Sequence, residues 1–165
     1  MRDEELLTRV RSRYADALLA RGEVTVTVGR EELVEALTWL RDEPDLAFRF
    51  LSDLSCTDWP GRDPRIWMAY HLFSLDHGHR VRVKTGLSEG DLTVPSVTPA
   101  FPAAVWHERE VFDFFGVEFR DHPDLRRILM PEGWEGHPLR KDHPLGGVAT
   151  AYHGATIPPP DEREA

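Results

Sequence analysis

The sequence predicts an α+β fold in which N-terminal helices pack on a mixed or antiparallel sheet, followed by another helix and an extended C-terminal arm. Stretches with apolar residues three and four positions apart alternate with stretches that are apolar at every second position. The composition then changes, because Gly and Pro make up 12 of residues 1–115 but 13 of residues 116–165. The total of 165 residues is the length of one domain.

Two helices and a strand are expected in the first 45 residues. Apolar residues from Leu6 to Leu18 form one helical stripe, and Gly22 is expected to end that helix. Alternation over 24–28 predicts a half-buried strand. A second amphipathic helix is expected over 33–40, with Pro44 closing it.

Three strands, a helix and an arm complete the predicted organisation. The strands are expected at 48–54, 66–75 and 80–87, the last two as a hairpin. A helix should follow over 102–115 and stop at Gly116. We therefore expect a core domain over 1–119 that includes this helix, an extended docking arm over 120–157 and a flexible tail over 158–165.

Charge and cysteine content exclude several classes of function. The net charge of −9 argues against nonspecific binding of nucleic acid and against binding to an acidic membrane surface. The single cysteine, Cys56, cannot form an intramolecular disulfide, a redox pair or an all-cysteine iron–sulfur site. We find no signal peptide and no apolar run long enough to span a membrane, which favours an intracellular protein that is soluble or peripheral.

No pattern for a cofactor or a catalytic nucleophile is apparent. The eight histidines lack the spacing of a metal site, and neither a dinucleotide fingerprint nor a phosphate-binding loop is present. Ser52, Ser55 and Cys56 lie beside a strand without the turn of a hydrolase nucleophile. We expect catalytic, cofactor-binding and metal-binding residues to be absent from this chain.

The segment from Trp106 to Phe119 is the most informative one. Glu108, Arg109, Glu110 and Asp113 fall within two helical turns, and Arg109 and Asp113 form an i,i+4 pair. One interpretation is a surface helix with salt bridges on its outer face, which are common and weak. The other is that these groups anchor the arm that follows or bind a neighbouring subunit.

The arm combines proline-fixed turns with basic residues, among them Arg126, Arg127, Arg140 and Lys141. Such a segment is stiff before it meets a partner, which lowers the entropic cost of docking. We therefore favour an interaction arm over a catalytic loop.

At these residues the sequence resembles one hydrophilic subunit of bacterial NADH:quinone oxidoreductase, the counterpart of the 30-kDa subunit of respiratory complex I. The family's signature matches at every position, and the run from Gly136 to Leu145 resembles a second family motif. The matching residues of the signature are Glu108-Arg109-Glu110, Asp113, Phe114-Phe115, His122, Arg126 and Ile128-Leu129.

The resemblance implies a structural subunit without a cofactor, with FMN and iron–sulfur clusters on partner subunits. It implies a place in the peripheral arm of a proton-translocating enzyme, beside the quinone-proximal subunit, which is the partner that contributes to the quinone pocket. The chain would lie at the cytoplasmic face of the inner membrane and be attached to it only through the complex. The residues expected to anchor it are Glu108, Arg109, Glu110, Asp113, His122, Arg126, Arg127, His137, Arg140 and Asp142.

Two alternatives remain open at this point. Related subunits occur in membrane-bound nickel–iron hydrogenases and formate hydrogenlyases, beside the large subunit. A protein of another class, a stand-alone hydrolase with Glu108 or Asp113 as base, would need measurable turnover without a partner.

Overall fold

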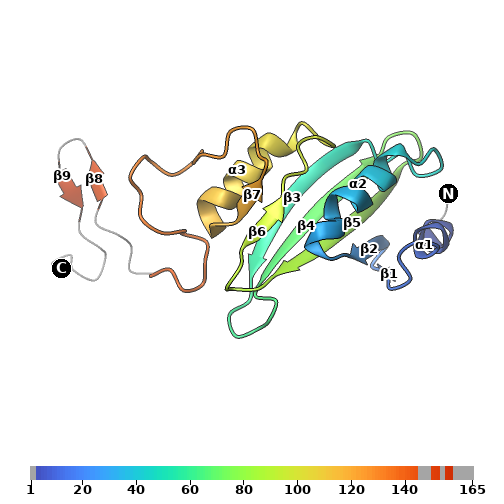
Figure 1. Ribbon diagram of the computed structural model, residues 1–165, viewed down its shortest axis with the longest axis horizontal. Coiled ribbons are helices and arrows are strands. Elements are labelled where there is room, and N and C mark those ends of the chain that lie inside the picture. Colours follow the sequence, from blue (N-terminus) through green and yellow to red (C-terminus); the bar gives the residue numbers. More distant parts are fainter. Residues whose placement is uncertain (1–2, 145–149, 153–154, 158–165) are drawn as a thin grey trace.

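The computed structural model describes residues 3–144, 150–152 and 155–157. Its α-helices are α1 (Asp3–Arg11), α2 (Leu33–Asp42) and α3 (Ala104–Phe115), and a short 3-10 helix, η1 (Arg30–Glu32), precedes α2. Its strands are β1 (Leu18–Ala20), β2 (Glu23–Thr27), β3 (Phe50–Asp58), β4 (Ile66–Ser74), β5 (His79–Leu87), β6 (Thr93–Pro95), β7 (Glu118–Arg120), β8 (Thr150–Tyr152) and β9 (Ala155–Ile157). The α+β class expected from the sequence is confirmed (Figure 1).

A five-stranded mixed sheet forms the centre of the fold. Its order is β1-β2-β5-β4-β3, and every neighbouring pair is antiparallel except β2 and β5. The expected hairpin is confirmed, because β4 and β5 pair from Ile66↔Leu87 to Ser74↔His79. Strand β3 lies at the edge of this sheet, where α3 packs against it.

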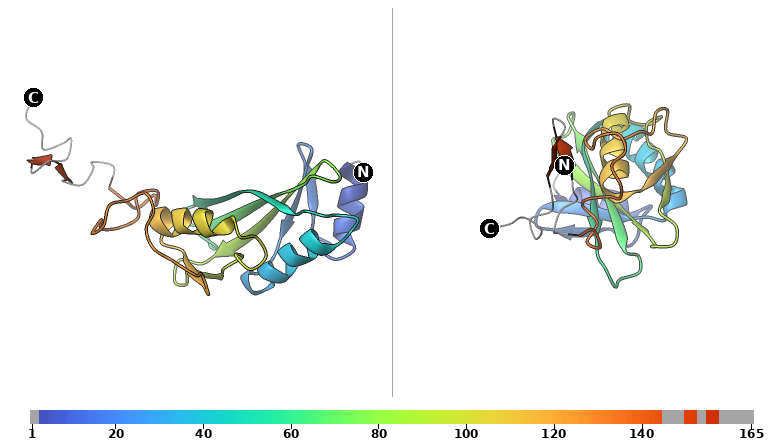
Figure 2. Two further views of the ribbon diagram at one scale, coloured as in Figure 1. Left: turned by 90° about the horizontal axis from the view of Figure 1, so that it is seen from above. Right: turned by 90° about the vertical axis from the view of Figure 1, so that its left-hand side faces the viewer.

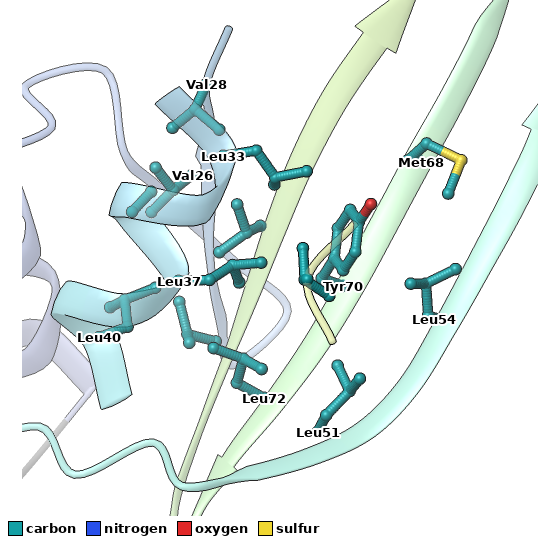
Figure 3. Packing of buried hydrophobic residues seen from close by; sticks show 14 of the residues in the cluster. Val26, Val28, Leu33, Leu37, Leu40, Leu51, Leu54, Met68, Tyr70 and Leu72 are labelled. Atoms are coloured by element: carbon teal, nitrogen blue, oxygen red, sulfur yellow. The ribbon is translucent and has the colours of Figure 1, made fainter. Parts of the chain in front are cut away.

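The core lies between the sheet and the helices. Helices α2 and α3 lie on the same side of the sheet (Figure 2). Leu33, Leu37 and Leu40 of α2 point toward the inward side chains of the strands, among them Tyr70 and Leu72 (Figure 3). All five are fully buried, at most 1% exposed. Each of the four leucines contributes roughly 1.5–3 kcal/mol by leaving water.

The first helix is shorter than the sequence suggests, and this expectation was wrong. Helix α1 ends at Arg11, and Leu18 belongs to β1 instead. Gly22 does not stop a helix: with Arg21 it forms the tight turn between β1 and β2, where both residues have positive φ (75° and 54°, respectively). Such a turn matches the twist of an antiparallel pair, so the strand pairing prevails over the helical spacing.

The later elements follow the expected order with some additions. Helix α3 begins at Ala104 and ends at Phe115, and Gly116 after it adopts the left-handed conformation with φ 75°. The strand expected at 48–54 begins at Phe50 and runs further than predicted, to Asp58. The short pair β6 and β7 and the hairpin β8–β9 were not predicted.

The arm leaves the core after β7. From residue 121 to residue 144 it contains no helix or strand. It runs beside α3 in both figures that show the whole chain (Figures 1 and 2). The tail expected at 158–165 lies outside the described residues.

Candidate functional site

Asp113 is the centre of the contacts between α3 and the arm. Its carboxylate is fully buried, and its Oδ2 accepts hydrogen bonds from the main-chain N–H groups of Ile128, Leu129 and Met130 at 3.1, 2.8 and 2.9 Å. Its Oδ1 accepts from Arg127 Nη1 at 2.7 Å. Burial raises the pKa of this carboxyl, but the four donors together outweigh burial and hold the pKa below its usual value. A charged Asp113 therefore fixes four consecutive residues of the arm.

Arg109 holds the same stretch of the arm by its carbonyl groups. Its Nε donates to the carbonyl of Arg126 and its Nη2 to that of Arg127, both at 3.0 Å. The guanidinium also lies over the ring of Trp106, 5.3 Å from the centroid. Arg109 and Asp113 thus bind the arm, one turn of helix apart, in place of the i,i+4 ion pair expected from their spacing. Of the alternatives that the sequence left open, anchoring of the following segment is the one these bonds bear out.

Glu108 lies on the inner side of α3 and is also fully buried. Its two oxygens accept hydrogen bonds at 2.7 Å, from Ser96 Oγ and from the N–H of Val97. Burial raises the pKa of Glu108 to about 7, because two neutral donors offset only part of the lost hydration. Glu108 ties α3 to the loop after β6.

His122 lies next to Glu108 at the start of the arm. Its Nε2 donates to the carbonyl of Val105 at 3.2 Å and lies 3.8 Å from Glu108 Oε2. Its Nδ1 accepts from the N–H of Asp124 at 3.0 Å. His122 thus links the start of the arm to the first turn of α3.

His137 and Arg127 fold a later part of the arm onto the end of α3. His137 Nδ1 donates to the carbonyl of Asp113 at 3.0 Å, and Arg127 Nη2 donates to the carbonyl of Gly136 at 3.1 Å. The ring of His137 lies so close to Gly116 that a Cβ there would be 2.6 Å from its Nε2. Gly116 therefore ends α3 and also leaves the space that the ring of His137 occupies.

A second ionic cluster holds the arm to the loop between β3 and β4. Arg65 binds Asp58 in a bidentate pair at 2.7 and 2.9 Å, and both side chains are buried. Asp58 also accepts the N–H of Lys141 at 2.8 Å, and Asp142 lies 3.0 Å from Arg65. Arg140 completes the cluster by binding Asp142 at 3.2 and 3.1 Å.

The structure brings most of the predicted residues into these contacts, and two remain at the surface. Glu110 is exposed on α3, and the side chain of Arg126 is 72% exposed and pairs only with Asp124 in the part of the chain described. Sequence reasoning missed Asp58, Arg65 and Ser96. Their signal was weak, because these residues are far from the arm in sequence.

Several apolar side chains around the same end of the molecule point outward. Leu129 is 59% exposed, and Leu139, Trp59 and Trp106 are about as exposed. A cavity of about 490 Å³ is lined by Trp59, Phe115 and Leu139, together with Cys56 and Lys141. Burial raises the pKa of the Cys56 thiol far above its usual value, so this group is a poor nucleophile.

Two features are absent from the described residues. Among residues 3–144, 150–152 and 155–157, no helix has both the length and the apolar character to cross a membrane. In the same residues no three metal-binding side chains come together. The expectation that no cofactor binds to this chain stays a prediction.

Comparison with known proteins agrees with the resemblance in the sequence. Residues 26–149 match the family model described as the 30-kDa subunit of respiratory-chain NADH dehydrogenase. A subunit of the NADH-quinone oxidoreductase of Roseiflexus castenholzii is 48% identical over 151 residues, which cover 89% of this chain and 87% of that protein. Its counterpart in Citrifermentans bemidjiense is 48% identical over 145 residues, 86% of this chain and 89% of the relative.

Solved structures show the same architecture. The trypsin-resistant fragment (1-134) of Nqo5 is 31% identical, with a TM-score of 0.65 over 76% of this chain and 100% of that one. A chain of the membrane-bound sulfane sulfur reductase, an archaeal respiratory membrane complex, is 25% identical, with a TM-score of 0.67 over 86% of this chain and 85% of that one. The family model covers well over half of the chain, and its match includes both α3 and most of the arm. This chain belongs to the family of the 30-kDa subunit of respiratory-chain NADH dehydrogenase.

Proposed function

We propose that the chain is a structural subunit of a proton-translocating NADH:quinone oxidoreductase, where its C-terminal arm packs against the quinone-proximal subunit. It binds no cofactor, and FMN and iron–sulfur clusters belong to partner subunits. It lies peripherally at the cytoplasmic face of the membrane and is held there by the complex. The names of its relatives support membership of this complex, and the arm supports the contact with the quinone-proximal subunit.

The observation that carries this proposal is the orientation of the arm. Its main chain is fixed to the core by Asp113, Arg109 and Asp58, whereas Leu129 and Leu139 remain exposed. Ordering an irregular segment costs conformational entropy, and the buried charges that hold it contribute little net stability. A preordered apolar surface lets a partner subunit bind without that loss of entropy at the moment of binding.

The relative in the sulfane sulfur reductase favours a second candidate, a subunit of a membrane-bound hydrogenase or related complex. That structure is 25% identical, against 48% for the NADH-quinone oxidoreductase relatives from Roseiflexus castenholzii and Citrifermentans bemidjiense. This difference in identity supports the quinone-reducing enzyme as the first candidate.

The experiment is co-purification with a tagged quinone-proximal subunit from membranes. The double variant Leu129→Asp/Leu139→Asp should lower the recovered chain at least tenfold, because each buried leucine is worth roughly 1.5–3 kcal/mol. Leu75→Asp is the matched control, since Leu75 is 72% exposed in the turn between β4 and β5, and it should co-purify normally.

Two further measurements complete this experiment. The wild-type complex should show NADH:quinone turnover, and the isolated chain should show no flavin or iron–sulfur absorption. Equal recovery of the double variant and the Leu75→Asp control would contradict the docking surface. Hydrolytic turnover of the isolated chain would favour the hydrolase.

A further inference from the structure

The side of the sheet away from α2 and α3 carries a basic stripe beside an aromatic one. Alternate side chains of a strand point to opposite faces, so the residues between the buried ones of β4 and β5 lie together on this side. All are exposed or half-buried. We call them the outer sheet face: Trp67, His71 and Phe73 of β4 with Arg80, Arg82 and Lys84 of β5.

Two of these three cations have no carboxylate partner among the described residues. The Arg80 guanidinium lies 5.6 Å from the ring centroid of Phe73, and Lys84 Nζ lies 4.6 Å from that of Trp67. A cation stacked on a ring keeps its N–H donors for another acceptor. Arg82 pairs with Glu23, but its buried Nε has no hydrogen-bond partner in the described part of the chain.

This stripe runs against the charge of the whole chain. The chain has 29 acidic and 20 basic residues, yet three basic residues occupy alternate positions of one strand on this face. The carboxylates near it are Glu23, which Arg82 and His71 already contact, and Asp53 of the edge strand. Donors are therefore in excess over acceptors at this surface, which makes it complementary to an acidic ligand.

We propose that the outer sheet face binds an acidic segment of a neighbouring protein subunit, with Arg80 and Lys84 meeting its carboxylates and Trp67 and Phe73 its aliphatic stems. This rests on the proposed function only in that the chain works inside a multi-subunit complex. A protein segment fits better than RNA, because the net charge of −9 repels a polyanion at long range, whereas a few carboxylates are attracted locally.

The test places a photo-reactive amino acid at Thr27 in the full chain within the assembled complex. Thr27 is exposed and pairs in register with Lys84, so its side chain borders the outer sheet face. We expect a cross-link to a peptide of another subunit that is rich in Asp and Glu. Arg80→Glu/Lys84→Glu should lower the cross-link yield at least tenfold at low salt, since like charges then face each other.

The matched control is Arg13→Glu, because Arg13 is exposed and also stacked, 5.3 Å from the ring of Trp39, but lies between α1 and β1, against α2 on the other side of the sheet. It should leave the yield unchanged. Arg80→Gln/Lys84→Gln only removes charge and should reduce the cross-link yield to a smaller extent. This variant keeps the test valid if the charge reversal prevents folding.

The outcomes separate this inference from the proposed function. If the quinone-proximal subunit co-purifies but Thr27 gives no cross-link, or one to RNA or to a peptide without acids, this inference is overturned and the proposed function stands. If no subunit co-purifies at all, both fail.

Discussion

Glu108 and Asp113 show how one helix places two buried carboxylates in opposite electrostatic states. Both side chains are fully buried on α3, five residues apart. Asp113 has an ion pair and three main-chain donors, so its charged form is stabilised. Glu108 is desolvated and accepts from two neutral donors, so its charged form is costly. The two buried carboxylates of this helix thus have separate roles.

The stability of the folded chain should therefore depend on pH through Glu108. Its pKa is raised from 4.5 to about 7 by burial, so the folded state holds a proton that the unfolded state has lost between these values. This group stabilises the fold below about pH 4.5, and the contribution is lost as the pH rises through 7, for a total of about 3 kcal/mol. Glu108→Gln keeps the shape of the side chain and stays neutral at every pH. As the pH rises through 7, the free energy of unfolding of the variant should therefore increase by this amount relative to that of the wild type. Urea unfolding of the full chain at a series of pH values measures it.

The matched control for this prediction is Glu110→Gln, an exposed carboxyl on the same helix. Its stability should run parallel to that of the wild type at every pH. The lowered pKa of Asp113 gives the opposite slope in acid, but it is common to all three proteins and cancels in the comparison. If the free energies of unfolding of Glu108→Gln and the wild type changed in parallel with pH, Glu108 would not be protonated near neutral pH in the folded chain.

At the scale of elements, the sequence pattern predicted the helices and strands that depend on residues close together in the chain. The stripe of α2, the glycine at the end of α3 and the alternation of β4 and β5 each appear as expected. Leu18 was assigned to a helix because its spacing fits one, and only its pairing with Thr25 of β2 makes it a strand residue. Asp58 and Arg65 could not be predicted as part of the site, because their role depends on a segment near Lys141 that returns from far along the chain.

The packing of the arm on α3 can be measured at Gly116. Gly116→Ala places a methyl group 2.6 Å from His137 Nε2 and an alanine at φ 75°. Gly133→Ala carries the same backbone cost, at φ 84°, but meets nothing within 4 Å. We expect Gly133→Ala to lose about 1 kcal/mol and Gly116→Ala to lose roughly 1–3 kcal/mol more, in urea unfolding of the full chain.

A third variant separates the collision from the backbone strain. Adding His137→Ala to Gly116→Ala removes the ring and should recover most of the additional loss, although the hydrogen bond to the carbonyl of Asp113 is then absent. Equal losses for the two glycine variants would mean that the arm moves away from α3 at little cost.

At the scale of the whole molecule, the chain offers two different surfaces. One is the apolar end where the arm, α3 and the loop after β3 meet, and the other is the basic and aromatic outer sheet face. The first depends on an irregular segment held by side chains, and the second on rigid strands. A substitution that loosens the arm should therefore affect the first surface and leave the second in place.

Arg109→Ala is such a substitution. It leaves no buried carboxylate of α3 without a partner, because Asp113 is bound by Arg127 and by main-chain N–H groups of the arm, and Glu108 by the loop after β6. The substitution leaves the carbonyls of Arg126 and Arg127 unpaired. Each is bound by a charged donor, and such a hydrogen bond is worth about 1.5–3 kcal/mol.

In the Arg109→Ala variant we expect the chain to fold and the arm to be cut faster by trypsin. The amount of co-purifying quinone-proximal subunit and the NADH:quinone turnover of membranes should fall together. Arg109→Lys should restore part of both, and Arg126→Ala, whose side chain is exposed, should change neither. Normal assembly and turnover in Arg109→Ala would mean that the quinone-proximal subunit does not depend on how the arm is held.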